Sequence, residues 1–175
     1  MRILIRPGGC NDVEFLAWAM LCASRGHLPR GLWDLLIGSG EGACLEYLVR
    51  LAIVDPRSLY HFENFLIAEV EGLAAAALCR FETKGGGWIA AGAAMTQVEH
   101  DLGWTAEDKQ ASDRRIDPMF ACLPPHSGAD WVIENVATRA EFRGRGLARA
   151  LLDSALSGRQ AALLSTGGDY HADWQ

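Results

Sequence analysis

The sequence lacks the features that mark membrane, secreted and zinc-binding proteins. No stretch reaches the roughly 18 consecutive apolar residues that a membrane-spanning helix needs, and the N-terminus lacks the long apolar core of a signal peptide. No C-x-x-C pair occurs, and no cysteines and histidines cluster as zinc ligands do. We therefore expect a cytoplasmic protein with no metal and no contact with a membrane. The five scattered cysteines indicate reduced, mostly buried thiols: Cys10, Cys22, Cys44, Cys79 and Cys122.

Positive charge is also scarce. The net charge is −6 at pH 7, whereas binding to a phosphate backbone needs a broad basic face, so we do not expect nucleic acid as the main partner. The acidity instead suits the attraction of a cationic amine substrate. Half of the residues are hydrophobic and 22% are charged, as in an ordinary soluble domain. A chain of 175 residues can build its own core, so we expect a single domain over residues 1–175.

Residues 131–152 differ from the rest of the chain, because positive charge is concentrated in this window. Apolar residues at 131–133 and Val136 predict a strand that is covered on both faces. Gly144 and Gly146 follow, and apolar residues then recur at helical spacing. The first turn of a helix has unpaired N–H groups and a partial positive charge, and glycine lets an anion approach them. The window predicts a site for a phosphate-bearing ligand or, as the alternative, a basic loop that merely starts a helix. Four arginines add full charges: Arg139, Arg143, Arg145 and Arg149.

This window resembles the phosphate-binding motif of the GCN5-related N-acetyltransferase (GNAT) family. The run Arg143-x-x-Gly146-x-Ala148 matches the family signature R/Q-x-x-G-x-G/A. Residues 134–138 look like the family's fourth strand, which ends five residues before the motif arginine, although Ala140 stands where a proline is common. The resemblance implies acetyl-coenzyme A as the cosubstrate. It places the pyrophosphate on Arg143, Gly144, Arg145, Gly146, Leu147 and Ala148, and the pantetheine arm on Val136, Ala137 and Thr138.

The resemblance also implies a fold. GNAT domains are α/β (α+β) proteins of three layers, α-β-α, in which helices cover both faces of a mixed, mostly antiparallel central sheet. In this chain the cofactor-binding core would span about 131–158, and an insertion would span about 84–130. The resemblance covers roughly residues 1–165, and the C-terminal helix and strands of relatives are missing. Because an unpaired strand edge is a liability, another chain would complete it, which allows a homodimer.

Local patterns predict the remaining elements. A first strand at 2–6 stops at Pro7-Gly8-Gly9, and a helix capped by Asn11 or Asp12 ends before Gly26. The turn Glu71-Gly72 joins two strands into a hairpin. Residues 83–87 form a flexible break from which no helix clearly opens. Further helices are predicted at 32–37, 43–53 and 105–115, the last with the capping residues Thr105 and Asp108. The hairpin strands are predicted at 65–70 and 73–81. A fifth strand is predicted at 161–165, after a helix that stops at Gly158.

The spacing Gly38-x-Gly40-x-x-Ala43 fits a dinucleotide-binding fingerprint. That fingerprint works only after a strand in a βαβ unit, and residues 32–36 predict a helix instead. We therefore interpret residues 38–42 as a flexible connection between two helices.

Acetyl transfer to an amine needs a group that removes a proton, because an amine with a pKa of about 10.4 is mostly charged at neutral pH. Glu134 lies on the predicted fourth strand, and some relatives use a glutamate in such a strand as the base. Burial there would raise its pKa toward the working range, whereas the alternative is a structural carboxylate paired with an arginine. Backbone N–H groups at 136–138 would stabilise the carbonyl oxygen. Tyr170 is the candidate proton donor, although its spacing does not match the tyrosine of relatives.

The predicted function is therefore direct transfer of an acetyl group from acetyl-coenzyme A to a primary amine of a small molecule or a protein. The alternative is a non-catalytic acyl-coenzyme-A-binding module, or pseudoenzyme, that a partner chain completes. Cys79 and Cys122 have no histidine partner suggested by spacing, and direct transfer needs no acyl-carrying thiol. In relatives the insertion shapes the acceptor pocket, so the following are either acceptor contacts or plain surface residues: Glu99, His100, Asp101 and His126.

Overall fold

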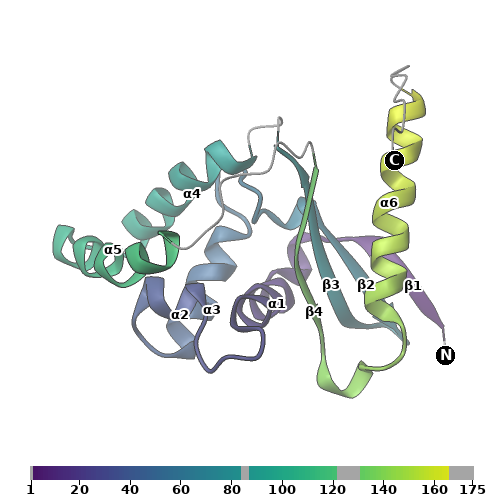
Figure 1. The fold of residues 1–175 in the computed structure, drawn as a ribbon, viewed down its shortest axis with the longest axis horizontal. Coiled ribbons are helices and arrows are strands. Elements are labelled where there is room, and N and C mark those ends of the chain that lie inside the picture. Colours follow the sequence, from purple (N-terminus) through teal and green to yellow (C-terminus); the bar gives the residue numbers. More distant parts are fainter. Residues whose placement is uncertain (1, 84–86, 122–130, 166–175) are drawn as a thin grey trace.

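The computed structural model describes residues 2–83, 87–121 and 131–165, and a four-stranded sheet lies at its centre (Figure 1). The strands are β1 (Ile3–Pro7), β2 (Phe65–Val70), β3 (Leu73–Glu82) and β4 (Trp131–Thr138), in the order β1-β2-β3-β4. Each neighbouring pair runs antiparallel. Within the described ranges β4 is therefore an edge strand. The predicted first strand, hairpin and fourth strand are confirmed.

The turn between β2 and β3 explains why this hairpin is predictable from the sequence. Glu71 and Gly72 have positive φ angles of 50° and 85°. A two-residue turn with positive φ at both positions matches the twist of the flanking strands, and glycine adopts such a backbone without a steric penalty. The hairpin is buried on both faces, as the complete burial of Ile67 and Leu78 shows. It therefore forms the middle of the sheet.

One face of the sheet carries the larger helical layer (Figure 1). α1 packs against β3 and β4, and α3 packs against α1. Farther from the sheet, α4 contacts α3, and α5 contacts α2. The core between these elements contains fully buried Leu16, Met20 and Leu48. The helices of this layer are α1 (Val13–Arg25), α2 (Leu32–Ile37), α3 (Glu41–Leu51), α4 (Gly87–Asp101) and α5 (Ala106–Phe120).

The opposite face is covered by α6 (Leu147–Ser165), which stands alone on the other side of the sheet from α1–α5 in Figure 1. Leu147, Leu151 and Ala155 recur every four residues, so they lie on one side of the helix. All three are buried and belong to a second core with Leu66 and Leu78 of the hairpin. The predicted α-β-α layering is confirmed, with a described sheet that is antiparallel throughout.

The predicted fifth strand is wrong, because α6 continues through residues 161–165 and ends at Ser165. For the same reason, Gly158 does not stop the helix. Residues 159–165 consist of Arg, Gln, Ala, Leu and Ser, without a β-branched or aromatic residue. Most of these residues are strong helix formers, and strands favour the types that are absent here. Helix propensity therefore outweighs the short apolar run that suggested a strand.

The insertion is more helical than its sequence suggests. α5 confirms the helix predicted at 105–115, and its cap is formed as expected: the Thr105 N–H donates to Asp108 Oδ2 (2.9 Å), and the Asp108 N–H donates to Thr105 Oγ1 (3.2 Å). The expected break at 83–87 is wrong at its last residue, because α4 begins at Gly87. Alanines at 90, 91, 93 and 94 favour the helix and offset its glycines.

The two predicted helices around Gly38 are confirmed, with α3 shifted two residues toward the N-terminus relative to the prediction. Gly38 ends α2 in the left-handed conformation (φ 71°), and a Cβ there would lie 2.6 Å from Cζ of Arg115. Since a helix precedes Gly38, the dinucleotide fingerprint lacks the strand that it requires. Residues 38–40 connect two helices, as interpreted. Every helix in the described ranges is too short or too polar to cross a bilayer.

Candidate functional site between β4 and α6

A bulge in β4 determines which way its side chains point. Glu134 pairs with Cys79 and Ala137 pairs with Ala77, so three steps along β4 match two steps along β3. The extra residue is accommodated at Asn135, which has a positive φ of 51°. Asparagine tolerates this left-handed backbone better than most residues do. The structure therefore contains a β-bulge beside Glu134 that the sequence pattern does not reveal.

The bulge places Glu134 on the face of the sheet that α1 covers. In a regular strand, residues three apart point to opposite faces, but here Glu134 and Ala137 lie opposite Cys79 and Ala77. Residues directly opposite each other share a face, and Ala77, Cys79 and Ala137 all belong to the core beneath α1. The Glu134 carboxyl consequently faces the larger helical layer and not α6.

The surroundings of Glu134 differ from those of a structural ion pair. Its side chain is half-buried, and its Oε1 accepts a hydrogen bond from Nδ2 of Asn135 (2.9 Å). No arginine in the described part of the chain forms a salt bridge with it. Burial raises the pKa of the Glu134 carboxyl above its ordinary value, and the Asn135 amide only partly opposes this. A base with a raised pKa is the chemistry that proton removal at neutral pH needs.

Tyr60 is a neighbour of Glu134 that sequence reasoning missed. The Cys79 thiol, opposite Glu134, donates to the carbonyl of Leu59 at 3.2 Å, which fixes the segment before β2 against the strand. Tyr60 is buried there, with its ring 5.1 Å from Trp33. Burial, followed by the Glu134 charge, raises the pKa of the Tyr60 phenol, so it remains protonated at neutral pH. Nothing in the irregular segment 52–61 signals this position in the sequence.

The same environment makes Cys79 inert. Burial raises the pKa of the Cys79 thiol well above its usual range, and the nearby Glu134 charge acts in the same direction. Because the thiolate is the nucleophile, a buried thiol that remains protonated is a poor acyl carrier. This agrees with the expectation of direct transfer.

The turn between β4 and α6 presents unpaired backbone donors. A short 3-10 turn at Ala140–Phe142 follows β4, and the ladder of α6 begins with the Ala150 N–H bond to the carbonyl of Gly146 (3.0 Å). Within the described residues, the N–H groups of Leu147, Ala148 and Arg149 donate to no backbone carbonyl. These are the orphan donors of a helix start, at the positive end of the helix dipole. The arrangement suits an anion.

Two glycines keep this turn accessible. Gly144 and Gly146 have positive φ angles of 74° and 77°, which only glycine adopts readily, and both are exposed. A Cβ at either position would meet no atom within 4 Å, so open space surrounds the turn. The side chain of Leu147 is buried against the sheet, which leaves only its amide for a ligand.

The arginines of the window divide between two places. Arg143 and Arg145 are exposed at the turn, where each is oriented by a carbonyl: Nε of Arg143 donates to Thr138 (3.2 Å), and an Nη of Arg145 donates to Glu141 (3.0 Å). Arg139 instead lies over the rings of Phe15 and Trp18, at 5.1 and 5.8 Å, on the α1 side. Arg149 is exposed in the first turn of α6, where its Nε lies 3.7 Å from Oδ2 of Asp153. The predicted cluster of four positive charges is therefore smaller at the turn itself, because Arg139 lies elsewhere and Arg149 is close to a carboxylate.

The strand residues predicted for the pantetheine arm lie next to this turn. Val136 is exposed, Ala137 is buried and Thr138 is half-buried. β3 pairs with one edge of β4, and no strand in the described ranges pairs with the other edge. Its N–H and C=O groups on that side are consequently available for hydrogen bonds with an extended amide chain.

Several other candidates lie apart from this site or outside the described residues. Glu99 is buried and bonded to Nζ of Lys109 (2.7 Å), whereas His100 and Asp101 are exposed and contact each other at 3.3 Å. No group of three potential ligands among the described residues could hold a metal. The remaining candidates fall outside those residues: Cys122, His126 and Tyr170.

Comparison with known proteins bears on the fold. No family model and no curated protein matches the sequence. Among solved structures, an acetyltransferase superimposes with a TM-score of 0.68 at 18% identity, over 91% of this chain and 75% of its own. An N-acetyltransferase from Staphylococcus aureus Mu50 superimposes with a TM-score of 0.55 at 21% identity, over 89% and 75% of the two chains. The chain therefore has a GNAT-type acetyltransferase fold, as its sequence predicts.

Proposed function

We propose that this protein transfers an acetyl group from acetyl-coenzyme A to a primary amine. The observation that carries the proposal is the start of α6, where the unpaired amides of Leu147, Ala148 and Arg149 follow two exposed glycines with open space around them. Exposed Arg143 and Arg145 add positive charge at the same place. This combination fits a diphosphate, and the acetyltransferase fold supports acetyl-coenzyme A as its source.

In this proposal the residues of β4 organise the chemistry. The open edge around Val136 to Thr138 pairs with the amides of the pantetheine arm, and an N–H there stabilises negative charge on the thioester oxygen. Glu134, whose pKa is raised by burial, takes a proton from the ammonium group of the acceptor. The freed amine forms the new C–N bond as the C–S bond breaks, its nitrogen gives up a second proton, and coenzyme A leaves as a thiolate that takes up a proton. Tyr60 is a protonated phenol close to Glu134 and is a second candidate for that proton transfer, beside Tyr170.

The second candidate function is a module that binds acyl-coenzyme A without turning it over. The unpaired edge of β4 favours it, because an open strand edge is one that a partner chain can complete. Both functions use the anion site at α6. They differ in whether Glu134 takes a proton from a bound amine.

The binding part of the proposal is tested by calorimetry with coenzyme A. Arg143→Glu places a negative charge beside the α6 amides, so we expect the Kd for coenzyme A to rise at least tenfold. The matched control is Arg57→Glu, which makes the same charge change at an exposed arginine between α3 and β2 and should leave the Kd unchanged. Equal effects of the two variants would show that only net charge matters and would contradict the site.

The catalytic part is tested by thiol release from acetyl-coenzyme A in the presence of a panel of primary amines. The enzyme proposal expects release with at least one amine. Coenzyme A binding without release for every amine would instead support the non-catalytic module.

A further inference from the structure

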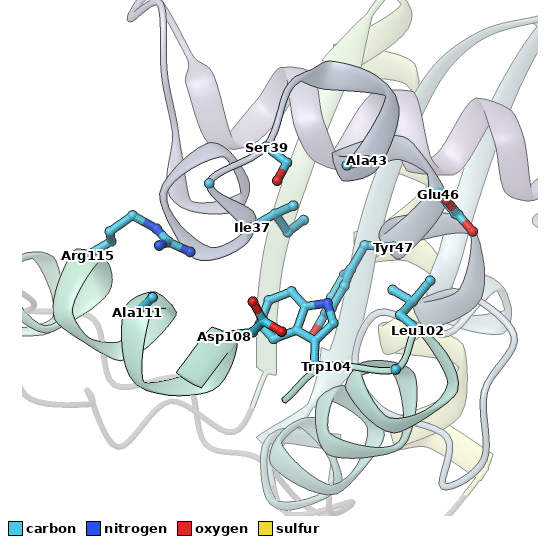
Figure 2. Close-up of a pocket in the computed structure, with 12 residues that line it drawn as sticks. Ile37, Ser39, Ala43, Glu46, Tyr47, Leu102, Trp104, Asp108, Ala111 and Arg115 are labelled. Carbon is cyan, nitrogen blue, oxygen red and sulfur yellow. The ribbon is translucent and has the colours of Figure 1, made fainter. Parts of the chain in front are cut away.

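A second pocket lies away from β4 and α6, between the α2–α3 connection and the α4–α5 connection (Figure 2). Its volume is about 370 Å³, which is within the range of small-molecule sites. Ile37 and Leu102 supply apolar wall, and Tyr47, Trp104, Asp108 and Arg115 supply polar or aromatic groups. We refer to it as the α2–α5 pocket. It shares no residue with the β4–α6 site.

The wall of the α2–α5 pocket contains an unpartnered hydroxyl. Tyr47 is fully buried, and its hydroxyl has no hydrogen-bond partner among the described residues. The indole of Trp104, which is only half-buried, lies next to the phenol ring with a centroid distance of 5.9 Å. Figure 2 shows the Tyr47 ring entering from α3 and ending at Trp104. A buried hydroxyl without a partner costs free energy, so a ligand group that reached it would relieve that cost.

The negative charge of the pocket is concentrated at Asp108. Thr105 donates to its Oδ2 from the backbone N–H (2.9 Å) and the hydroxyl (2.8 Å), and both bonds leave Oδ1 unused. These bonds lower the pKa of the Asp108 carboxyl, so it is ionised at neutral pH. In Figure 2 this carboxylate overlaps the Trp104 ring, and both residues line the pocket. An ionised oxygen and an indole ring in one pocket are a combination that attracts a cation.

The other charges around the pocket are largely engaged elsewhere. The Arg115 guanidinium donates to the α2 carbonyls of Leu35 (2.6 Å) and Leu36 (2.9 Å), so it closes the end of that helix. Glu46, on the rim, pairs with Arg50 at 3.0 Å. Glu99, whose charge acts on Tyr47, pairs with Lys109 at 2.7 Å. Of the two carboxylates that line the pocket, Glu46 and Asp108, Asp108 is therefore the one without a salt bridge among the described residues.

We propose that the α2–α5 pocket binds a small organic ammonium ion, with its charged head between Asp108 and Trp104, its apolar body against Ile37 and Leu102, and the Tyr47 hydroxyl as a hydrogen-bonding partner. Binding at this pocket does not depend on acetyl-coenzyme A. The ligand links α5 to α3 and stabilises the packing of the insertion on the rest of the helical layer.

The test uses three probes of similar shape and different charge: phenethylammonium, 2-phenylethanol and phenylacetate. We expect phenethylammonium to bind at least tenfold more tightly than 2-phenylethanol, and phenylacetate not to bind, as measured by calorimetry and by perturbation of the Trp104 indole signal in NMR. Equal binding of the charged and neutral probes would overturn the proposal.

Variants locate the site. Asp108→Asn keeps an oxygen for the Thr105 cap and removes the charge, so the affinity for phenethylammonium should fall at least fivefold. Asp113→Asn, an exposed position on the same helix, is the matched control and should not change it. If Glu134→Gln abolishes binding while Asp108→Asn does not, the amine binds beside β4 and the α2–α5 pocket is excluded.

Tyr47→Phe gives an independent readout. Removing an unpartnered buried hydroxyl should raise the Tm of the ligand-free protein and lower the affinity for phenethylammonium. A lower Tm together with unchanged affinity would show that the hydroxyl serves the fold alone and would overturn its assigned role.

Discussion

Asn135 shows how one backbone angle determines the chemistry available to its neighbour. Its positive φ inserts an extra residue into β4 and places Glu134 on the α1 face, beside Cys79 and near Tyr60. The sequence identifies Glu134 as an acid on a buried strand, because its neighbours are apolar. The sequence does not reveal the bulge, because asparagine occurs in many backbone conformations. The strand is also too short for its side-chain alternation to show a shift of one residue. The partnership with Tyr60 is likewise hidden, because it depends on an irregular segment.

Glu134→Gln tests the residue directly. The variant cannot accept a proton, so we expect the turnover number for amine acetylation to fall about 100-fold while the Kd for coenzyme A stays unchanged. In the wild type the rate should fall as the pH drops through the raised pKa of Glu134, because the base is then protonated. Assays of thiol release at a series of pH values measure the turnover number and its dependence on pH. Glu82→Gln, at an exposed position at the end of β3, is the control.

The same variant has an opposite effect on stability. A carboxyl whose pKa is raised in the folded state destabilises the fold when it is ionised, so the cost begins as the pH rises past the ordinary pKa of the unfolded chain and is complete above the folded pKa. Glu134→Gln should therefore raise the Tm at pH 7, and this gain should vanish below about pH 4, where the carboxyl is protonated in both states. A lower Tm at pH 7 would show that the carboxylate is stabilised and not desolvated.

At the scale of elements, α6 connects the proposed anion site to the core. Its first residue, Leu147, offers an amide to the turn and a side chain to the second core, so packing of the helix fixes the direction of the unpaired donors. The start of α6 is predictable because glycines and helical periodicity agree. Its end is not, since a short apolar run fits a strand and a buried helix equally well. The helix propensity of residues 159–165 decides for the helix.

Two leucines five residues apart on α6, and therefore on different sides of the helix, test this packing. Leu151 is fully buried against the hairpin, whereas Leu156 is 53% exposed. We expect Leu151→Ala to lower the free energy of unfolding by about 2–5 kcal/mol, and Leu156→Ala to change it by no more than about 0.5 kcal/mol. Urea denaturation measures both. Equal losses would contradict the orientation of the helix.

At the scale of the whole molecule, the two proposed sites are joined by a row of aromatic rings. From the α2–α5 pocket, Trp104 contacts Tyr47 (5.9 Å between centroids), Tyr47 contacts Trp33 (6.1 Å), and Trp33 contacts Tyr60 near Glu134 (5.1 Å). The layered fold is predictable because the sequence resembles a known family, and the glycine turn before α6 is predictable because its signals are local. The pocket and the row are not, because they join residues from distant segments whose proximity exists only in the folded chain.

The central claim is that the first amides of α6 bind the diphosphate of coenzyme A. The most direct measurement is a titration of the ¹⁵N-labelled protein with coenzyme A, followed by NMR at the amides of Leu147, Ala148 and Arg149. We expect large downfield shifts at these three amides, because they acquire charge-assisted hydrogen bonds, and small shifts at Leu151 and beyond, where the ladder is already complete. Saturation with coenzyme A that leaves these three amides unmoved would contradict the account.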